Sequence, residues 1–178
     1  MPALADLAAF SEDAAGQRLV HVVVETSRGG RNKLAYDPEL GVFKLKKVLP
    51  EGMCFPCDFG FVPSTRGGDG DPLDALILMD EPGVTGCLVT CRLIGALLSA
   101  QGQAGKTVRN DRLVTVAVPS HRYGRVERID DLGDPFLSQV ESFFTSYHAQ
   151  YGTPYHVLGR EGPDGAWRLV TAGLRSTR

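Results

Sequence analysis

A series of short β-strand patterns covers the chain from residue 19 to residue 119. β-Branched and aromatic residues fill these segments, and glycine or Asp-Pro pairs stand between them, as expected for turns. Strands at such short spacing are typical of a small β-barrel. The glycine-bearing segment 99–110 is expected to be a hairpin loop. The predicted strands lie at residues 19–26, 32–37, 42–48, 55–62, 74–79, 86–98 and 112–119.

One helix is predicted after these strands. From Phe136 to Tyr147, apolar side chains recur at every third or fourth position, which predicts a helix that lays one aromatic face on the barrel. Asp134 is expected to cap its N-terminus, with Pro135 at the first helical position and Gly152 at its end.

The length of the chain favours a single domain. It has 178 residues, and one domain over residues 1–178 is the default at that length. Within it we expect an N-terminal extension at 1–18 and a C-terminal cover with a basic tail at 160–178. The segments 155–161 and 166–173 are expected to be strand or irregular structure.

Charge and hydropathy narrow the classes of function. The formal net charge is −2, which argues against a protein that grips a nucleic-acid backbone, since that work needs a clear basic excess. No segment approaches the roughly 20 apolar residues that span a bilayer, and the first residues show no signal-peptide pattern. We therefore expect a cytoplasmic protein with no membrane or nucleic-acid partner.

Four cysteines raise the question of a zinc site. Cys54 and Cys57 form a C-x-x-C pair, and Cys87 and Cys91 lie four residues apart in a strand pattern. Four thiolates can hold zinc. However, the first pair lacks a turn glycine, and the second pair is spread about 13 Å along a strand. Buried, reduced thiols are the favoured interpretation.

The sharpest candidate for chemistry is the segment D-G-D-P-L-D, which contains Asp69, Asp71 and Asp74 and leads into an apolar strand. Gly70 permits a tight turn and Pro72 fixes its own backbone, so several carboxylates can point to one place. Converging carboxylates repel one another unless a cation lies between them, and an all-oxygen ligand set suits Mg²⁺ or Mn²⁺. A solvated acidic turn is the alternative, but the rigid pattern favours a metal site.

Alternation along the first strands places several charged side chains where they need a partner. Glu25 shares a face with His21 and Val23, and Lys33 shares one with Ala35, while Tyr36 points away. Lys47 is predicted to point inward, with Lys46 on the opposite face. Because a buried lysine needs an anion, Lys33 and Lys47 either form ion pairs with the aspartates or bind phosphate.

Several motifs recur in a fixed order along residues 20–150. They are Glu25, Lys33, the F-P-C-D-F-G-F run, D-G-D-P-L-D, the strand C-R-L-I-G, and Tyr147 in F-F-x-x-Y. In this order they resemble the soluble inorganic pyrophosphatases of family I. The resemblance implies a mainly β protein with α-helices, built as an OB-type five-stranded closed barrel with flanking helices. It also implies Mg²⁺-dependent hydrolysis of pyrophosphate to two phosphates, a cytoplasmic location and, as in bacterial members, a homohexamer.

The resemblance also implies roles for individual residues. Asp69 and Asp74 would bind metal, and Asp71 would bind metal and help to deprotonate the attacking water. Glu25 would hold an outer metal. The residues that would bind substrate phosphate are Lys33, Lys47, Arg112, Tyr147 and His148, of which Lys33, Lys47 and Tyr147 also belong to the catalytic set.

The site departs from the family pattern at several positions. A glutamate of the family is Ala35 here, an arginine is Lys47, and two tyrosines are Phe55 and Phe59. The lysine that follows the helix tyrosine is His148, which is cationic only part of the time at neutral pH. These changes remove one carboxylate, two hydroxyls and the two-pronged grip of a guanidinium.

The largest departure lies in the loop before the last predicted strand. The family pattern there is aspartate, four residues, aspartate, one residue and lysine. Here Asn110 stands for the second aspartate and Arg112 for the lysine, and no carboxylate is near the first. Asp111 would point to the opposite face unless the hairpin is bulged, whereas Asn110 can offer a neutral oxygen.

Three functions compete. The site has about three negative charges fewer than the family's pattern, so the chain is either a slow pyrophosphatase with fewer metals or an inactive relative that binds a phosphate compound or a partner. The third is a single-stranded nucleic-acid module, with a basic patch at 28–33 and an aromatic platform of Phe55, Phe59 and Phe61. The core-like setting of these rings makes it the weakest hypothesis.

Overall fold

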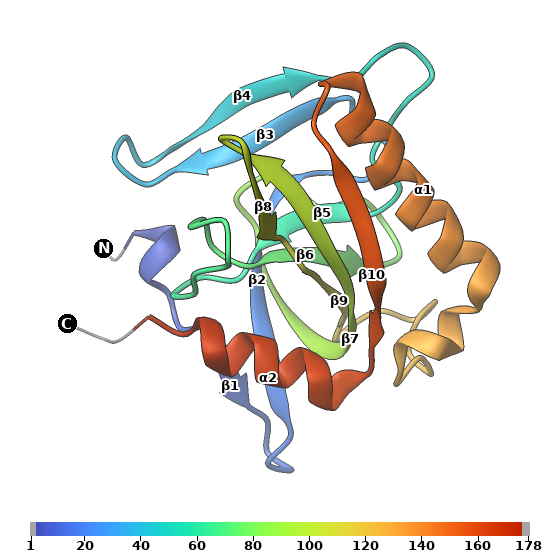
Figure 1. The fold of residues 1–178 in the computed structure, drawn as a ribbon. Helices are drawn as coiled ribbons and strands as arrows, with labels where there is room; N and C mark the ends of the chain where they lie inside the picture. Colours follow the sequence, from blue (N-terminus) through green and yellow to red (C-terminus); the bar gives the residue numbers. More distant parts are fainter. Residues whose placement is uncertain (1–2, 176–178) are drawn as a thin grey trace.

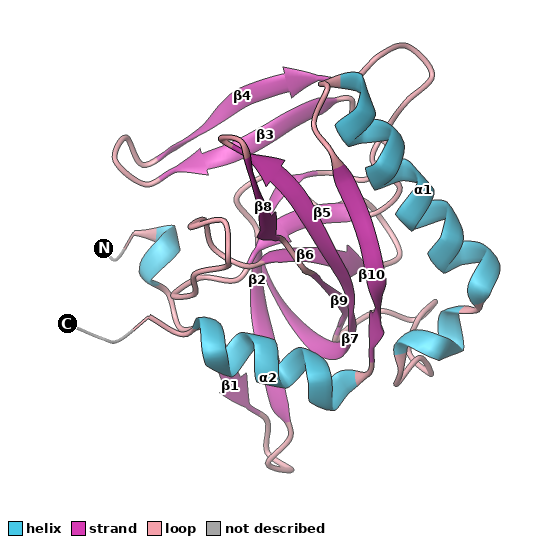
Figure 2. Ribbon diagram, in the orientation of Figure 1, coloured by secondary structure: helices cyan, strands magenta, loops and turns pink. Residues whose placement is uncertain are grey.

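The computed structural model describes residues 3–175, with the backbone alone for Gln103. Residues 176–178, which belong to the predicted basic tail, lie outside the described residues, as do residues 1–2. The described chain is mainly β, with two α-helices on the outside of the strands (Figure 2). No helix within residues 3–175 combines the length and apolar character that a membrane crossing requires.

Five strands form a closed ring, which confirms the predicted five-stranded barrel (Figure 1). β2 (Arg18–Thr26) closes it by pairing with both β5 (Asp58–Phe61) and β7 (Leu88–Gln103). β6 (Asp74–Leu78) pairs with β5, and β9 (Arg112–Ala117) pairs with β7. β6 and β9 run parallel to each other, whereas the other four pairs in the ring are antiparallel.

Further strands extend this ring. β1 (Phe10–Glu12) pairs with β2, and both β8 (Lys106–Arg109) and β10 (Tyr155–Glu161) pair with β7. β3 (Asn32–Asp37) and β4 (Val42–Val48) form a separate two-stranded sheet, which stands across one end of the barrel in Figure 1.

Helices cover the outside of the barrel. α1 (Asp134–Gln150) lies beside β10, and α2 (Pro163–Gly173) packs against β7. Two short 3₁₀ turns, η1 (Leu4–Asp6) and η2 (Ile129–Leu132), precede β1 and α1.

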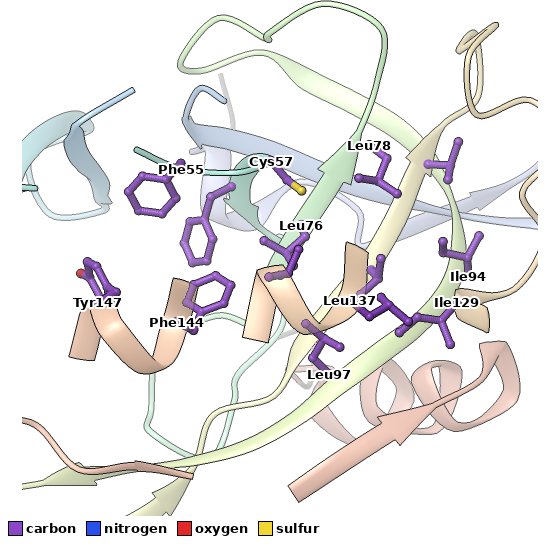
Figure 3. Close-up of a cluster of buried hydrophobic side chains, with 14 of the residues drawn as sticks. Phe55, Cys57, Leu76, Leu78, Ile94, Leu97, Ile129, Leu137, Phe144 and Tyr147 are labelled. Atoms are coloured by element: carbon purple, nitrogen blue, oxygen red, sulfur yellow. The ribbon is translucent and has the colours of Figure 1, made fainter. Parts of the chain in front are cut away.

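The main core lies between α1 and the barrel (Figure 3). Leu137 and Phe144 of α1 pack there with Phe55, Leu76 and Ile94, all at most 2% exposed. Burying a side chain of this size contributes roughly 1.5–3 kcal/mol. The aromatic face predicted for the helix is therefore what fixes α1 to the barrel.

Three predictions of local structure were wrong in detail. Asp134 is the first residue of α1 rather than its cap, because Gly133, at φ 76°, occupies the N-cap position. Segment 166–173 lies in the helix α2 rather than in a strand or irregular structure. The predicted loop 99–110 is mostly the β7–β8 hairpin, whose turn residues Ala104 and Gly105 both have positive φ, as tight hairpin turns require.

Candidate functional site

A pocket of about 700 Å³ opens beside the barrel. Its walls come from the β3–β4 sheet, the segment 65–74, the β7–β8 hairpin and α1. Pockets of roughly 300–1,000 Å³ are typical of small-molecule sites. The lining includes every predicted site residue, namely Glu25, Lys33, Lys47, Asp69, Asp71, Asp74, Arg112, Tyr147 and His148.

The segment that carries the three aspartates is tied at both ends. Buried Thr65 accepts a hydrogen bond from the backbone N–H of Leu73 at 3.0 Å. Gly67 N–H donates to the carbonyl of Asp71 at 2.6 Å. Between them Gly70 has φ 96°, a conformation that glycine adopts without a steric cost. The tight turn predicted from Gly70 is thus present.

Five carboxylates line the pocket, one of them Asp6 of η1, and we call the other four, Glu25, Asp69, Asp71 and Asp74, the acidic wall. Burial, followed by the charge of Asp74, raises the pKa of Asp69 to about 6. Burial also raises the pKa of Asp74, and Glu25 and Asp71 act in the same direction. Like charges disfavour ionisation of their neighbours, so the acidic wall is a place where a cation would be stabilised.

The donor set of the acidic wall fits a hard divalent cation, because all of its ligand atoms are carboxylate oxygens. Within residues 3–175, no three His, Cys, Asp or Glu side chains are already arranged to hold a metal ion. The acidic wall therefore supplies suitable ligands that would have to draw together around the ion.

Lys33 pairs with the acidic wall rather than standing alone. Its Nζ lies 3.4 Å from Oε2 of Glu25 and 3.7 Å from the centroid of the Phe59 ring. The other oxygen of Glu25 accepts a hydrogen bond from the backbone N–H of Tyr36 at 2.7 Å. An ammonium over an aromatic face is stabilised and held in place, so Lys33 stays directed at the pocket.

Both Lys46 and Lys47 line the pocket, whereas Lys46 was predicted to point away. A shift of register between Lys33 and the next residue of β3 inserts one extra residue into β4, and such a bulge breaks the alternation of faces. Nζ of Lys47 lies 3.9 Å from the ring centroid of Tyr151. Burial, with the charge of Lys33, lowers the pKa of Lys47.

Arg112 is 3% exposed and is held from several sides. Its guanidinium carbon lies 4.1 Å from the centroid of the Phe144 ring, and Nη2 lies 3.8 Å from Oδ2 of Asp74. Nη1 donates to Ser99 Oγ at 3.0 Å and to Tyr155 Oη and the carbonyl of Asn110 at 3.1 Å.

His148 is a neutral neighbour of Arg112. Its ring stacks on Tyr155 with centroids 4.6 Å apart and planes 6° from parallel. Burial, followed by the charges of Arg112 and Lys47, lowers the pKa of His148 to about 4. The expectation of a partly cationic His148 at neutral pH is therefore wrong.

Tyr147 stands beside these groups, and burial raises its pKa to about 12. Its ring lies 6.1 Å from that of Phe143, centroid to centroid, in a stacked arrangement. The hydroxyl is therefore protonated at neutral pH and can act as a hydrogen-bond donor.

The rings proposed as a nucleic-acid platform are core residues. Phe55, Phe59 and Phe61 are only 2%, 3% and 4% exposed, and β5 begins at Asp58, later than the predicted start at residue 55. Bases need exposed aromatic faces on which to stack, so these phenylalanines offer no platform.

The β7–β8 hairpin brings one predicted and one unforeseen residue to the pocket. Asn110 lines the pocket as expected, and so does Gln101. Asp111 is engaged elsewhere, accepting from Arg109 Nη2 at 2.8 Å and from the backbone N–H of Ser99 at 3.0 Å. Sequence reasoning missed Gln101 because a lone amide in a predicted loop carries no pattern. Its place opposite Val108 across the hairpin is known only from the structure.

The cysteines divide into two kinds. Cys57 and Cys91 are buried, and burial raises the pKa of each to about 12. Cys54 and Cys87 are exposed, so the prediction that all four are buried thiols was wrong for these two. Cys87 precedes β7, which starts at the next residue.

Comparisons with known proteins agree on one family. The family model described as inorganic pyrophosphatase matches residues 22–178. The inorganic pyrophosphatase of a Synechocystis species is 34% identical over 152 residues, covering 85% of this chain and 88% of its own. That of Thermus thermophilus is 35% identical over 153 residues, covering 86% and 79%.

Solved structures give the same result. The crystal structure of inorganic pyrophosphatase from Thermus thermophilus matches with a TM-score of 0.85 and 32% identity, covering 97% of both chains. The Helicobacter pylori inorganic pyrophosphatase matches with a TM-score of 0.81 and 30% identity, covering 95% of this chain and 97% of that one.

Proposed function

Because the chain belongs to the inorganic pyrophosphatase family, we propose that it hydrolyses inorganic pyrophosphate to two phosphates. One observation carries the proposal: the four carboxylates of the acidic wall and the cationic Lys33, Lys47 and Arg112 line a single pocket. A ligand with several negative charges needs both kinds of residue. The carboxylates would hold metal ions that neutralise its charge, and the ammonium and guanidinium groups would bind it directly.

The acidic wall would hold Mg²⁺, with Mn²⁺ as a substitute. Asp69, Asp71 and Asp74 would be ligands, and Glu25 would hold an outer ion. When bound, the ions supply a water molecule of lowered pKa and neutralise charge on the phosphoryl oxygens. Asp71 is exposed and adjoins Asp69, a position from which its carboxylate would accept the proton of the attacking water.

The remaining residues would bind and orient the two phosphates. Lys33 and Lys47 bring ammonium groups that aromatic rings hold in place. Tyr147 would donate its hydroxyl proton to a phosphate oxygen. Arg112 would bind the departing phosphate, and neutral His148 would contribute a ring N–H rather than a charge. These groups stabilise charge that develops on the leaving group.

A phosphate-release assay tests the proposal. Purified protein with pyrophosphate and Mg²⁺, or with Mn²⁺, is expected to release phosphate well above the uncatalysed rate. Asp71→Asn should slow release by at least about a hundredfold, since it removes the group that takes the proton. Asp164→Asn, an exposed residue of α2, is the matched control and should leave the rate unchanged.

The alternative function is an inactive relative that binds a phosphate compound. Ala35, Phe55 and Phe59 favour it, because they give the pocket no carboxylate or hydroxyl where the family pattern has one. Equal rates for the unaltered protein and Asp71→Asn, both at background, would support this alternative and contradict pyrophosphate hydrolysis.

We also propose a cytoplasmic, homo-oligomeric protein built as one domain, with a hexamer as the assembly that the family resemblance implies. Exposed apolar side chains on and beside β4, among them Leu40, Leu45 and Val48, support self-association. Light scattering on a size-exclusion column should give a mass that is a multiple of 19.2 kDa. A single-chain mass at micromolar concentration would contradict this.

A further inference from the structure

One side of the pocket contains no free carboxylate. Gln101 near the end of β7, Asn110 after β8 and Arg112 at the start of β9 line it together, and we call these three residues the hairpin wall. Two of them are neutral amides and the third is a guanidinium. The hairpin wall is thus neutral to positive, in contrast to the acidic wall.

Two buried polar atoms of the hairpin wall have no hydrogen-bond partner among residues 3–175. They are Oε1 of Gln101 and Nε of Arg112. Leaving a buried polar group unsatisfied is costly, and both residues line the pocket. Both atoms are almost inaccessible to solvent, so a ligand in the pocket would complete their hydrogen bonds by displacing the side chains that cover them.

The geometry of Arg112 decides which part of it meets that ligand. Nη1 already has Ser99, Asn110 and Tyr155 as acceptors, and Nη2 lies between His148 and Asp74. The unused donor is Nε. A planar guanidinium held this firmly presents its free N–H in one direction, and phosphate oxygens are the acceptors that arginine binds best.

The amides suit the same ligand. Rotating the Gln101 amide by half a turn exchanges its oxygen for its NH₂ group, so it can donate to an anion as well as accept from a protonated one. An amide oxygen can also bind a cation, but without the charge that holds a hard divalent ion tightly. The nearby Asp111 cannot supply that charge, because Arg109 and the backbone of Ser99 occupy it.

We propose that the hairpin wall is a phosphate subsite that binds a phosphate group directly, through Gln101, Asn110 and Arg112, without a bridging divalent cation. The identity of the ligand as phosphate rests on the proposed function. In this chain, metal ions then act only at the acidic wall, and the phosphate held by the hairpin wall is recognised by hydrogen bonds.

Calorimetric titration with inorganic phosphate in the presence of EDTA at pH 7 tests this subsite. The unaltered protein is expected to bind one phosphate per chain. Gln101→Glu keeps the size of the side chain but adds a negative charge, and Asn110→Asp does the same at the second amide. Each substitution should weaken metal-free phosphate binding by roughly ten- to a hundredfold, because it removes a hydrogen bond to a charged group and adds repulsion between the new carboxylate and the phosphate.

Thr107→Glu is the matched control, because it adds the same charge to the same hairpin at an exposed position of β8. It should leave phosphate binding unchanged. A second measurement counts Mn²⁺ ions by electron paramagnetic resonance: the double variant Gln101→Glu, Asn110→Asp should bind one ion more per chain than the unaltered protein, since it restores carboxylates to this wall.

Two results would overturn the subsite: no phosphate binding to the unaltered protein in EDTA, or equal weakening by Thr107→Glu and Gln101→Glu. These outcomes are separate from the test of hydrolysis. Phosphate binding without pyrophosphate hydrolysis would contradict the proposed function and leave the subsite standing, whereas hydrolysis without metal-free binding would contradict the subsite alone.

Discussion

Three cationic side chains of this pocket are held in place by the aromatic rings against which they pack. Lys33 and Arg112 rest on phenylalanine rings, and Lys47 rests on a tyrosine ring. Alternation along the strands assigned Glu25 and Lys33 to strand faces, and the family resemblance was needed to predict that both belong to the site. Alternation could not predict Lys46, because a bulge in β4 depends on how two strands pair rather than on the residues of one strand.

At this scale His148 gives a stability prediction. Its pKa falls from 6.5 in the unfolded chain to about 4 in the folded protein, so between these values the unfolded state binds a proton that the folded state does not. The contribution of His148 to the free energy of unfolding should therefore be fully present above pH 6.5. About 3 kcal/mol of it should be lost as the pH drops from 6.5 to 4.

Urea denaturation at several pH values measures this effect. His148→Gln keeps a hydrogen-bonding side chain without a titratable ring, and the difference between the two proteins isolates the contribution of His148 from that of the carboxylates. That difference should change with pH mainly between pH 6.5 and 4. A difference that is constant with pH would contradict the assignment of a neutral, buried imidazole.

The strand elements were predictable because their residues alternate and glycines separate them. α2 was not, because it has only eleven residues and includes Gly165 and Gly173, which weaken a helical pattern. The sequence predicts a loop at 99–110 because glycines in that segment favour turns. The pairing of β7 with β8 and β10 overrides that preference.

Gly60 tests how closely two elements of the barrel approach. A Cβ atom built on Gly60 of β5 would lie 2.0 Å from the carbonyl oxygen of Val23 in β2. Backbone cannot yield as a flexible side chain can, so Gly60→Ala should lower the free energy of unfolding by about 3 kcal/mol or more.

Gly162→Ala is the comparison for that experiment. The atom nearest to its added Cβ is the end of the Arg128 side chain, at 3.2 Å, which can move aside. Its cost should stay within about 1 kcal/mol. Thermal unfolding of both variants measures the contrast, and equal costs would mean that β2 and β5 separate more easily than their pairing indicates.

The whole molecule brings the acidic wall together from distant parts of the chain. Glu25 comes from β2, Asp74 begins β6, and Asp69 and Asp71 lie in the segment before it. The spacing of the aspartates in the sequence indicates that they act together. Gln101 and Asn110 come to the same pocket only after the hairpin forms, so no local pattern could reveal the hairpin wall.

A cation that ties these elements together should stabilise the folded state. We expect 10 mM Mg²⁺ to raise the melting temperature by several degrees, following the ratio of its concentration to its dissociation constant. Asp69→Asn should reduce this increase. Potassium chloride at matched ionic strength is the control, and an equal increase with potassium would contradict specific binding by the acidic wall.

Asp74 and Arg112 are register partners on the two parallel strands β6 and β9. Neighbouring strands in a sheet stay roughly 4.8 Å apart, so the distance between the acid and the base at this point is set by the backbone ladder. The backbone at this point can therefore neither widen nor tighten when a ligand binds, and only the side chains of the two residues can move. A larger backbone adjustment to what is bound must come from the rim, where the β3–β4 sheet stands outside the ring.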